Sequence, residues 1–279
     1  MNQIKKKEFE YQVLQEFLPQ VGEVQNLLKT YITPERLNRF DNVLSKRSRR
    51  ILTVFEDTHH CHNISAILRT QDALGFHDVL FQYDTTPTYK NFRAKDSVER
   101  GSSTWLNAKH SPSIEACAHY LKERGYAIGL VSLPSFAITG DKYKQELPAF
   151  SPEDFQSEPF KEWLDDRPIA LVFGAEKRGI SEQWKDFADF YAYVPMYGFV
   201  ESFNVSVCAA MLLNSFRLNL ERLYKTPYLT EAEHQLILET WVSRRCKNAE
   251  TMLKKLHPEL LPYFRYSRGA DYWFDLNRS

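Results

Sequence analysis

Between residues 51 and 225 the sequence alternates short apolar segments with longer amphipathic ones. The apolar segments have the length of β-strands, and the segments between them place their apolar residues at helical spacing. The clearest strand is Ile169-Ala-Leu-Val-Phe173, which is apolar at every position, as expected of a strand covered on both faces. Strands that alternate with helices favour parallel pairing, because each helix returns the chain to the start of the next strand. The sequence therefore predicts an α/β domain with a mostly parallel sheet.

The other elements of this domain are predicted from hydrophobic spacing and from capping residues. Strands are predicted at residues 51–55, 79–81, 103–106, 127–132 and 190–194. Helices are predicted from Asn63, as N-cap, to Gly75, from Pro112 to Gly125, and from Asn204 to Lys225. Residues 134–166 carry several prolines and acidic residues and are predicted to form a long excursion.

Helical segments are predicted on both sides of the α/β domain. Residues 1–32 are amphipathic, and Thr33-Pro34 has the character of an N-cap followed by the first position of a second helix. Thr230 and Glu233 have the spacing of a capping box, which predicts a further helix. We therefore divide the chain into an N-terminal helical extension (1–50), an α/β domain (51–225) and a C-terminal helical extension (226–279).

The charge of the chain is balanced, with 36 basic and 36 acidic residues. This excludes a protein that is basic over its whole surface, although a local basic face can still attract phosphates. The cysteines form no C-x-x-C pair and are expected to be reduced thiols of a cytoplasmic protein; they are Cys61, Cys117, Cys208 and Cys246. We expect no membrane span, which needs roughly 20 apolar residues, and no secretory signal.

Three segments carry candidate functional residues. The first is Asn63-Ile-Ser-Ala-Ile-Leu-Arg69-Thr, on the first predicted helix of the α/β domain. Arginine is rarely buried without a partner. Arg69 therefore either pairs with Asp72, three residues further along the helix, or serves a ligand.

The other two segments begin where predicted strands end. They are Phe173-Gly174-Ala-Glu176-Lys-Arg-Gly179-Ile and Val194-Pro-Met196-Tyr-Gly198-Phe-Val-Glu-Ser202-Phe203-Asn204-Val-Ser206-Val. Ligands bind at the carboxyl ends of parallel strands, and glycine lets the backbone approach them closely. The alternative for the second segment is an ordinary strand-to-helix turn. The alternative for the third segment is helix capping. Capping accounts for one of the polar residues Ser202, Asn204 and Ser206 but not for all three.

Together the three segments resemble the motifs of the SpoU branch of the SPOUT RNA methyltransferases, the TrmH-like ribose methylases. Members carry N-x-S-A-I-x-R-T, then G-x-E-x-x-G-I/V, then I-P-M-x-G-x-x-x-S-L-N-V-S-V-A. This chain carries all three in that order, and the resemblance covers roughly residues 40–225. It departs from the pattern at Val194 and Phe203, where isoleucine and leucine are usual, and at Gln71, where a small residue is common.

The resemblance implies a SPOUT-type parallel sheet in which the last two motifs form a deep trefoil knot that holds S-adenosylmethionine. It also implies a homodimer whose site lies near the subunit interface. No structural metal is expected, for a reason that concerns residues 59–62 and is given below. Cofactor contacts are implied for Ser132, Gly174, Val194, Met196, Gly198, Phe203 and Ser206. Catalytic roles are implied for Arg69, Asn63, Glu176, Ser202 and Asn204.

The chemistry of ribose methylation leaves two roles open for Arg69. A ribose hydroxyl is a weak nucleophile, so methyl transfer requires a proton acceptor and in-line positioning. A free guanidinium, with a pKa above about 12, is a poor base. Arg69 is therefore a base only if its surroundings lower that pKa, and the alternative is that it orients ribose and phosphate through bidentate hydrogen bonds.

Three further features are weighed against simpler explanations. His59-His-Cys61-His62 resembles a metal cluster, but contiguous residues of one loop seldom all reach one ion, so RNA contact is preferred. Basic residues on the helical flanks are expected at solvated surfaces or at phosphates; those predicted to bind RNA are Arg47, Arg49, Arg50, Arg217 and Arg222. The aromatic C-terminal end is expected to pin the tail to the protein rather than to stack on bases.

The sequence therefore predicts a tRNA ribose 2′-O-methyltransferase that acts on the D-loop guanosine, as TrmH-like members do. An rRNA ribose methylase of the same fold and a non-catalytic RNA-binding factor are the alternatives. The C-terminal helices favour tRNA, and the joint presence of Asn63, Arg69, Glu176 and Asn204 argues against a non-catalytic factor.

Overall fold

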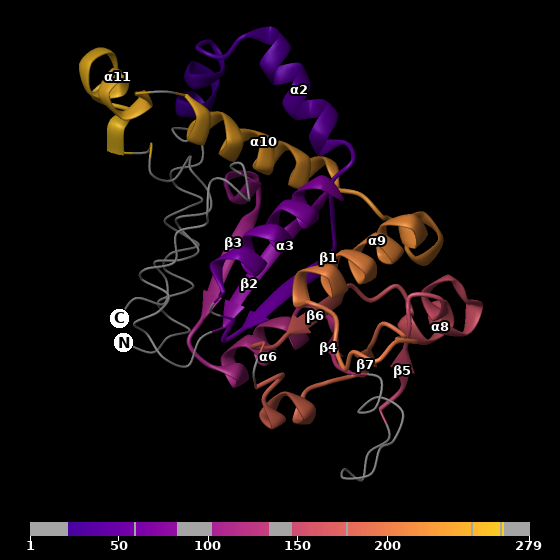
Figure 1. Cartoon of the computed structure of the whole chain (residues 1–279). Coiled ribbons are helices and arrows are strands. Elements are labelled where there is room, and N and C mark those ends of the chain that lie inside the picture. Colours follow the sequence, from indigo (N-terminus) through magenta and orange to yellow (C-terminus); the bar gives the residue numbers. More distant parts are fainter. Residues whose placement is uncertain are drawn as a thin grey trace. The chain divides into compact units, whose positions relative to one another are not determined.

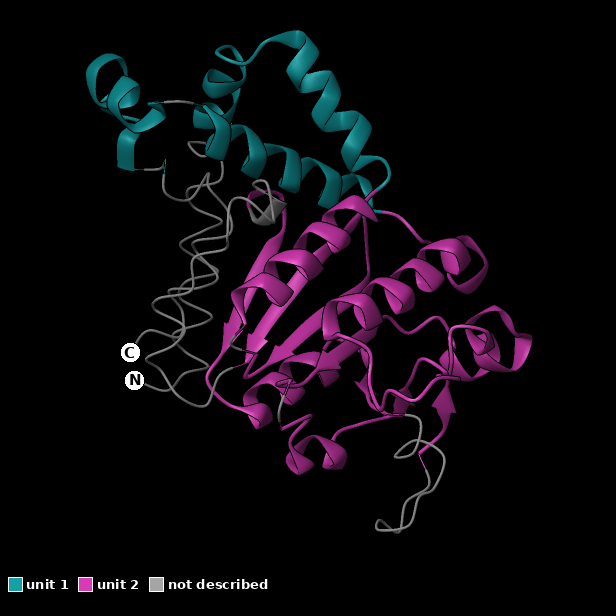
Figure 2. Cartoon of the chain, viewed as in Figure 1, with its two compact units in different colours: residues 1–46, 229–279 teal, residues 47–228 magenta. Residues whose placement is uncertain are grey.

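The computed structural model describes residues 22–58, 60–82, 102–133, 147–176, 178–246, 248–262 and 264. The chain divides into two compact units, residues 47–228 and residues 1–46 with 229–279 (Figure 2). Most of the helix predicted at the N-terminus, His59 and nearly all of the aromatic C-terminal end lie outside the described residues.

The larger unit contains a seven-stranded sheet in the order β3-β2-β1-β6-β4-β7-β5 (Figure 1). Every pairing is parallel, which confirms the predicted sheet. The strands are β1 (Ser48–Glu56), β2 (Phe76–Gln82), β3 (Asn107–Ser111), β4 (Ala127–Val131), β5 (Ala149–Phe150), β6 (Ile169–Phe173) and β7 (Phe190–Ala192). β6 is buried at all its positions and has the predicted bounds, because a strand covered on both faces leaves the plainest sequence signal.

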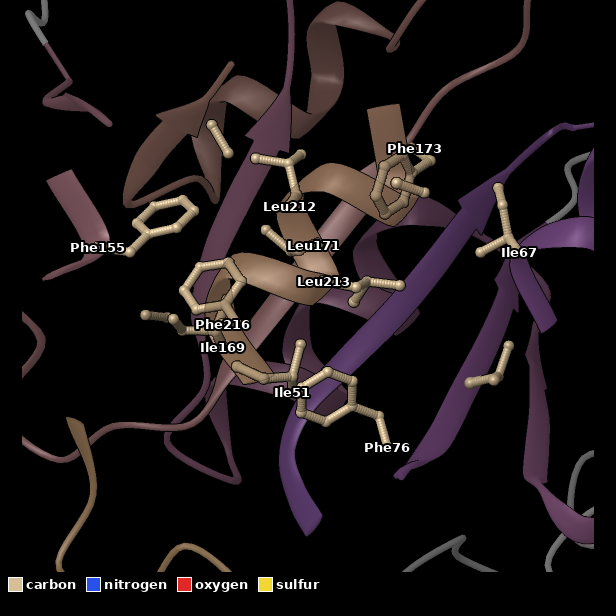
Figure 3. Packing of buried hydrophobic residues seen from close by; sticks show 14 of the residues in the cluster. Ile51, Ile67, Phe76, Phe155, Ile169, Leu171, Phe173, Leu212, Leu213 and Phe216 are labelled. Atoms are coloured by element: carbon tan, nitrogen blue, oxygen red, sulfur yellow. The ribbon is translucent and has the colours of Figure 1, made fainter. Parts of the chain in front are cut away.

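Helices cover both faces of this sheet. Within the described residues of the unit, the α-helices are α3 (Cys61–Ala73), α6 (Ile114–Lys122), α8 (Glu158–Leu164) and α9 (Val205–Leu223), and the short 3-10 helices are η1 (Ser102–Trp105), η2 (Asp154–Gln156) and η3 (Glu182–Asp186). α3, α8 and α9 share one hydrophobic cluster with the sheet, whereas α6 and η3 pack on the opposite face. In Figure 3, Leu212 and Phe216 of α9 lie against Leu171 and Ile169 of β6. The alternation of side chains along each strand therefore supplies two cores.

Several predicted element boundaries are wrong. Residues 103–106 form η1 and a turn rather than a strand, and the strand follows as β3 at the sheet edge. Its first four residues are only half-buried, so β3 lacks a strong apolar pattern. α3 begins at Cys61 with His60 as N-cap, so Asn63 lies inside the first turn. Gly75, at φ 78, follows the helix as predicted, because glycine adopts this left-handed conformation readily.

The described part of the predicted excursion, from residue 147, is more ordered than expected. It contains β5, η2 and α8. Phe155 of η2 stacks on Phe216 of α9 with ring centroids 4.0 Å apart. Phe155 and Phe160 are fully buried, so this segment is part of the core.

The smaller unit is helical and includes α2 (Pro34–Leu44), α10 (Glu231–Arg245) and α11 (Ala249–Leu256). Both predicted caps are confirmed, since Thr33 caps α2 and Thr230 forms a reciprocal capping box with Glu233. α2 and α10 pack together, with Phe40 and Trp241 edge to face at 5.8 Å between ring centroids. The helices before and after the α/β region thus belong to one compact unit. Within the described residues, no helix combines the length and apolar character that a bilayer crossing requires.

Candidate active site

A cavity of about 680 Å³ opens at the carboxyl ends of β4, β6 and β7. β4 lies between β6 and β7 in the sheet, so the three segments that follow these strands meet at one edge. The lining includes residues that follow β4 (132 and 133), residues that follow β6 (174–176, 178–180 and 182) and residues between β7 and α9 (194, 196 and 202–204). A cavity of this size at this edge of a parallel sheet is typical of a small-molecule site.

The loop after β6 doubles back on itself at Gly174. Gly179 donates its N–H to the carbonyl of Ala175 at 2.8 Å, and the two residues form an antiparallel bridge. A Cβ atom at Gly174 would lie 2.3 Å from the backbone of Gly179 and 2.5 Å from the nitrogen of Ile180. Only glycine therefore fits at position 174 without displacing the loop.

A chain of hydrogen bonds joins all three sequence motifs beside the cavity. The side-chain amide of Asn63 on α3 donates to Glu176 at 2.9 Å, and that of Asn204 donates to the Asn63 oxygen at 3.2 Å. The Asn204 oxygen in turn accepts from the backbone and hydroxyl of Ser206 at 2.9 and 2.6 Å. Asn204 thus caps α9, as predicted, and also holds Asn63.

The structure brings together most of the predicted site residues. Those that line the cavity are Ser132, Gly174, Glu176, Val194, Met196, Ser202, Phe203 and Asn204. Asn63 reaches this set through Glu176 and Asn204. Gly198 and Ser206, which were predicted to contact the cofactor, are not part of the lining.

Arg69 is exposed on α3 and does not belong to the cavity lining. It lies six positions beyond Asn63, which corresponds to about 9 Å along a helix axis. Asp72, its predicted alternative partner, instead forms an ion pair with the buried Arg47. The position of Arg69 in the single chain therefore does not distinguish a base from a residue that orients the ribose.

Sequence reasoning missed several residues of the cavity. Glu182 and Lys185 of η3, Arg178 and Tyr191 all contribute to its wall. The sequence offered one signal that could have identified them, which is that they lie close to the second motif or within the last predicted strand. Cys208 also lines the cavity, and burial raises the pKa of its thiol to about 11, so it is neutral at physiological pH.

Arg47, which was predicted to bind RNA, is buried in the structure. Its side chain is 1% exposed, pairs with Asp72 and donates to the carbonyl of Phe76 at 3.0 Å. α2 ends at Leu44, before the basic run, and Ser48 already begins β1, so Arg47 turns into the protein.

The other arginines predicted to bind RNA also make contacts within the protein. Arg49 binds Asp78 at 2.7 Å, and Arg50 donates to the carbonyl of Thr226 at 2.9 Å. Arg222 donates to Glu158 at 3.1 Å, while Arg217 lies 5.4 Å from the ring centre of Tyr228. Their binding to RNA stays a prediction. Within the described residues, no group of three or more His, Cys, Asp or Glu side chains is placed to hold a metal ion.

Comparison with known proteins adds independent observations. The profile of the SpoU rRNA Methylase family matches residues 50–214. The chain is 32% identical over 216 residues to the tRNA (guanosine(18)-2'-O)-methyltransferase of Thermus thermophilus, covering 76% of this chain and 98% of that protein. It is 29% identical over 211 residues to the protein of the same name from Escherichia coli, covering 74% and 82% of the two chains. The crystal structure of the Aquifex aeolicus TrmH/SpoU tRNA modifying enzyme superposes with a TM-score of 0.59 at 27% identity, covering 75% of this chain and 96% of the other.

Proposed function

The chain belongs to the SpoU rRNA Methylase family, and we propose that it is an S-adenosylmethionine-dependent tRNA ribose 2′-O-methyltransferase that acts on guanosine 18. The observation that carries this proposal is the hydrogen-bonded set Asn63, Glu176 and Asn204 beside the strand-end cavity. The choice of nucleotide is supported by the names of the Thermus and Escherichia relatives. The alternative is that the substrate is rRNA rather than tRNA, with the same ribose methylation.

The residues of the cavity fit S-adenosylmethionine. Val131, Phe173, Val194 and Phe203 supply apolar walls suited to an adenine ring. The carboxylates of Glu176 and Glu182 belong to the same lining and suit a positively charged sulfur and ammonium group. Ser132 and the 194–203 loop would hold the cofactor together with these residues.

When bound, S-adenosylmethionine supplies an electrophilic methyl group for transfer to the 2′-oxygen of a ribose. The hydrogen bond between Asn63 and Glu176 fixes the orientation of both side chains at the cavity edge. The donor and acceptor groups that this bond does not use are therefore held in fixed directions. Asn204 holds this pair in register with α9. Such fixed polar groups favour in-line positioning of the ribose, a contribution that can lower the barrier by several kcal/mol.

Arg69 completes this assignment as the residue that orients the ribose and its phosphate. A guanidinium offers a planar fork of donors that matches a phosphate, and the exposure of Arg69 leaves it accessible to RNA. The alternative role is that of the base that removes the 2′-hydroxyl proton. Substitution by lysine, which keeps the charge but removes the fork, separates these roles.

A homodimer with the site near its interface is part of the proposal. The loop before α9 carries Tyr197, Phe199 and Val200, which are 93%, 109% and 65% exposed. These apolar side chains adjoin the cavity-lining residues Met196 and Ser202. Their exposure in a single chain supports burial against a second copy.

A trefoil knot in the segment from β6 to α9 is also proposed. It is supported by the order of strands, since β7 follows β6 in sequence but lies beyond β4 in the sheet. α9 then returns to pack on α3, which follows β1. Pulling the chain from both ends in an optical trap tests this idea. An unfolded contour that reaches about 3.3–3.6 Å for every residue between the handles would exclude a knot.

The remaining assignments follow from the same function. Residues 51–225 are assigned to the methyltransferase domain, and the flanking regions 1–50 and 226–279 are assigned to contact with tRNA. The action on tRNA supports a cytoplasmic location.

Methyl transfer to purified RNA tests the function directly. The chain is incubated with S-adenosylmethionine carrying a tritiated methyl group and with either total tRNA or rRNA, and the modified nucleotide is mapped. We expect transfer to the ribose of guanosine 18 of tRNA and little transfer to rRNA. Methyl transfer to rRNA alone would support rRNA as the substrate. Transfer to neither RNA would contradict the enzyme assignment and favour a non-catalytic RNA-binding factor. Asn63→Ala serves as the matched variant, because it removes the residue that joins α3 to the other two motifs.

A further inference from the structure

Glu56, the last residue of β1, is a buried carboxylate outside the three motifs. Its exposed fraction is 2%, and it shares a strand face with Leu52 and Val54, which pack against α6 and η3. Burial, and next the charge of Glu56, raises the pKa of the neighbouring Cys117 thiol. Removing a carboxylate from water is unfavourable unless hydrogen bonds compensate it, so the hydrogen bonds that Glu56 accepts determine whether it can be buried here.

The carboxylate of Glu56 binds the end of the loop that follows β6. The backbone N–H of Ser181 donates to both of its oxygens at 3.1 Å. Ser181 is the residue that precedes η3, and its neighbours Ile180 and Glu182 line the cavity. Glu56 therefore connects β1 directly to the wall of the proposed cofactor site.

The two residues after Glu56 contact the same loop at other points. Thr58 places its hydroxyl 3.5 Å from the carbonyl of Gly174, at the start of the loop. Asp57 lies 3.9 Å from the guanidinium of Arg178, in its middle. Residues 56–58 thus contact the 174–181 loop at its beginning, middle and end.

We propose that Glu56 is a positioning residue that holds the 174–181 loop through Ser181. The carboxylate sets the end of the loop, while the close packing of Gly174 on Gly179 sets its start. Glu176, between these two points, then meets Asn63 at 2.9 Å. The catalytic consequence rests on the proposed methyltransferase function, whereas the contact with Ser181 does not.

Amide hydrogen exchange of the full-length protein tests the positioning role independently of activity. In Glu56→Ala we expect the Ser181 amide to exchange at least about tenfold faster than in the wild type, because its acceptor is lost. Glu56→Gln keeps one neutral acceptor oxygen, so its Ser181 exchange should fall between the two. Thr53→Val on the same strand, whose side chain points to the other face of the sheet, should leave Ser181 unchanged. A folded Glu56→Ala protein with wild-type exchange at Ser181 would overturn the proposal.

Cofactor binding and kinetics test the consequence for the site. Titration with S-adenosylhomocysteine in a calorimeter should give a Kd about tenfold to a hundredfold higher for Glu56→Ala, with partial recovery in Glu56→Gln. KM for S-adenosylmethionine should rise and kcat should fall, while the affinity for tRNA stays within about twofold. If Glu56→Ala does not fold, Glu56→Gln decides, and wild-type exchange together with wild-type cofactor affinity would refute the role. If the wild-type chain methylates no RNA, the proposed function fails, but the Ser181 measurement still decides the positioning role.

Discussion

Gly174→Ala is the substitution whose effect follows most directly from the structure. The added Cβ would lie 2.3 Å from the carbonyl carbon and oxygen of Gly179 and 2.5 Å from the nitrogen of Ile180. These three atoms belong to the backbone, so no side-chain rotation relieves the overlap. The loop must therefore move away from β6 by about 1 Å to restore ordinary contact distances.

The expected magnitude is large for the addition of one methyl group. Forcing an extra carbon into a closely packed region costs about 1–3 kcal/mol, and backbone contacts place Gly174→Ala at the upper end. For a chain of this size, a loss of about 3 kcal/mol lowers Tm by roughly 6–12 °C. The cavity wall formed by Gly179 and Ile180 moves with the loop, so cofactor affinity should fall by about tenfold or more.

Thermal unfolding and calorimetric titration with S-adenosylhomocysteine measure these two effects. Gly22→Ala is the matched control, because a Cβ at Gly22 meets nothing within 4 Å. We expect Gly22→Ala to keep the wild-type Tm within about 2 °C. A Gly174→Ala protein with wild-type Tm and wild-type affinity would show that the loop does not close against Gly174 in solution.

Four further outcomes are expected. Thr53→Val should raise the free energy of unfolding by about 1 kcal/mol in denaturant titrations, because the buried Thr53 hydroxyl has no hydrogen-bond partner among the described residues; a loss of stability would contradict this expectation. Arg69→Lys should lower kcat/KM for tRNA methylation by about a hundredfold if the guanidinium fork orients the ribose, and largely retained activity would reject that role. Phe199→Glu should shift the proposed homodimer to a monomer in light scattering, whereas a dimer mass that Phe199→Glu leaves unchanged would place the interface elsewhere. Burial alone would raise the pKa of Asp78, but Arg49 and neighbouring donors outweigh burial, so the pKa is lowered. The ionised Asp78 therefore stabilises the fold above pH about 4, and this stabilisation is lost as the pH falls through the lowered pKa. Arg49→Met should reduce this acid dependence in unfolding titrations between pH 3 and 7, and an unaltered slope would contradict it.

Local patterns predicted those features that depend on near neighbours. The bounds of β6, the caps at Thr33 and Thr230 and the start of α9 at Asn204 all agree with expectation. Each depends on hydrophobic spacing or on hydrogen bonds within one turn of helix, and the sequence displays both. The edge strand β3 was misplaced, because a half-buried strand shows little apolar contrast.

The identity of the motif residues was readable from the sequence, but their partners were not. Asn63 was predicted to cap its own helix, yet its side chain joins Glu176, 113 positions further along the chain. Arg47 was predicted to face RNA, yet the end of α2 at Leu44 turns it toward Asp72. The order in which strands meet decides such contacts, and no local pattern encodes that order.

The alternation of strand and helix from residue 51 to 225 therefore established the α/β class and the parallel sheet, because both follow from spacing along the chain. The resemblance of the three motifs to those of a known family indicated the family, because the sequence displays their residues and their order directly. Only the folded chain brought Glu56 within hydrogen-bond distance of Ser181, 125 positions away in sequence. Burial of a carboxylate requires hydrogen-bond donors, and the loop that follows the neighbouring strand β6 brings one of them, the backbone N–H of Ser181, to Glu56.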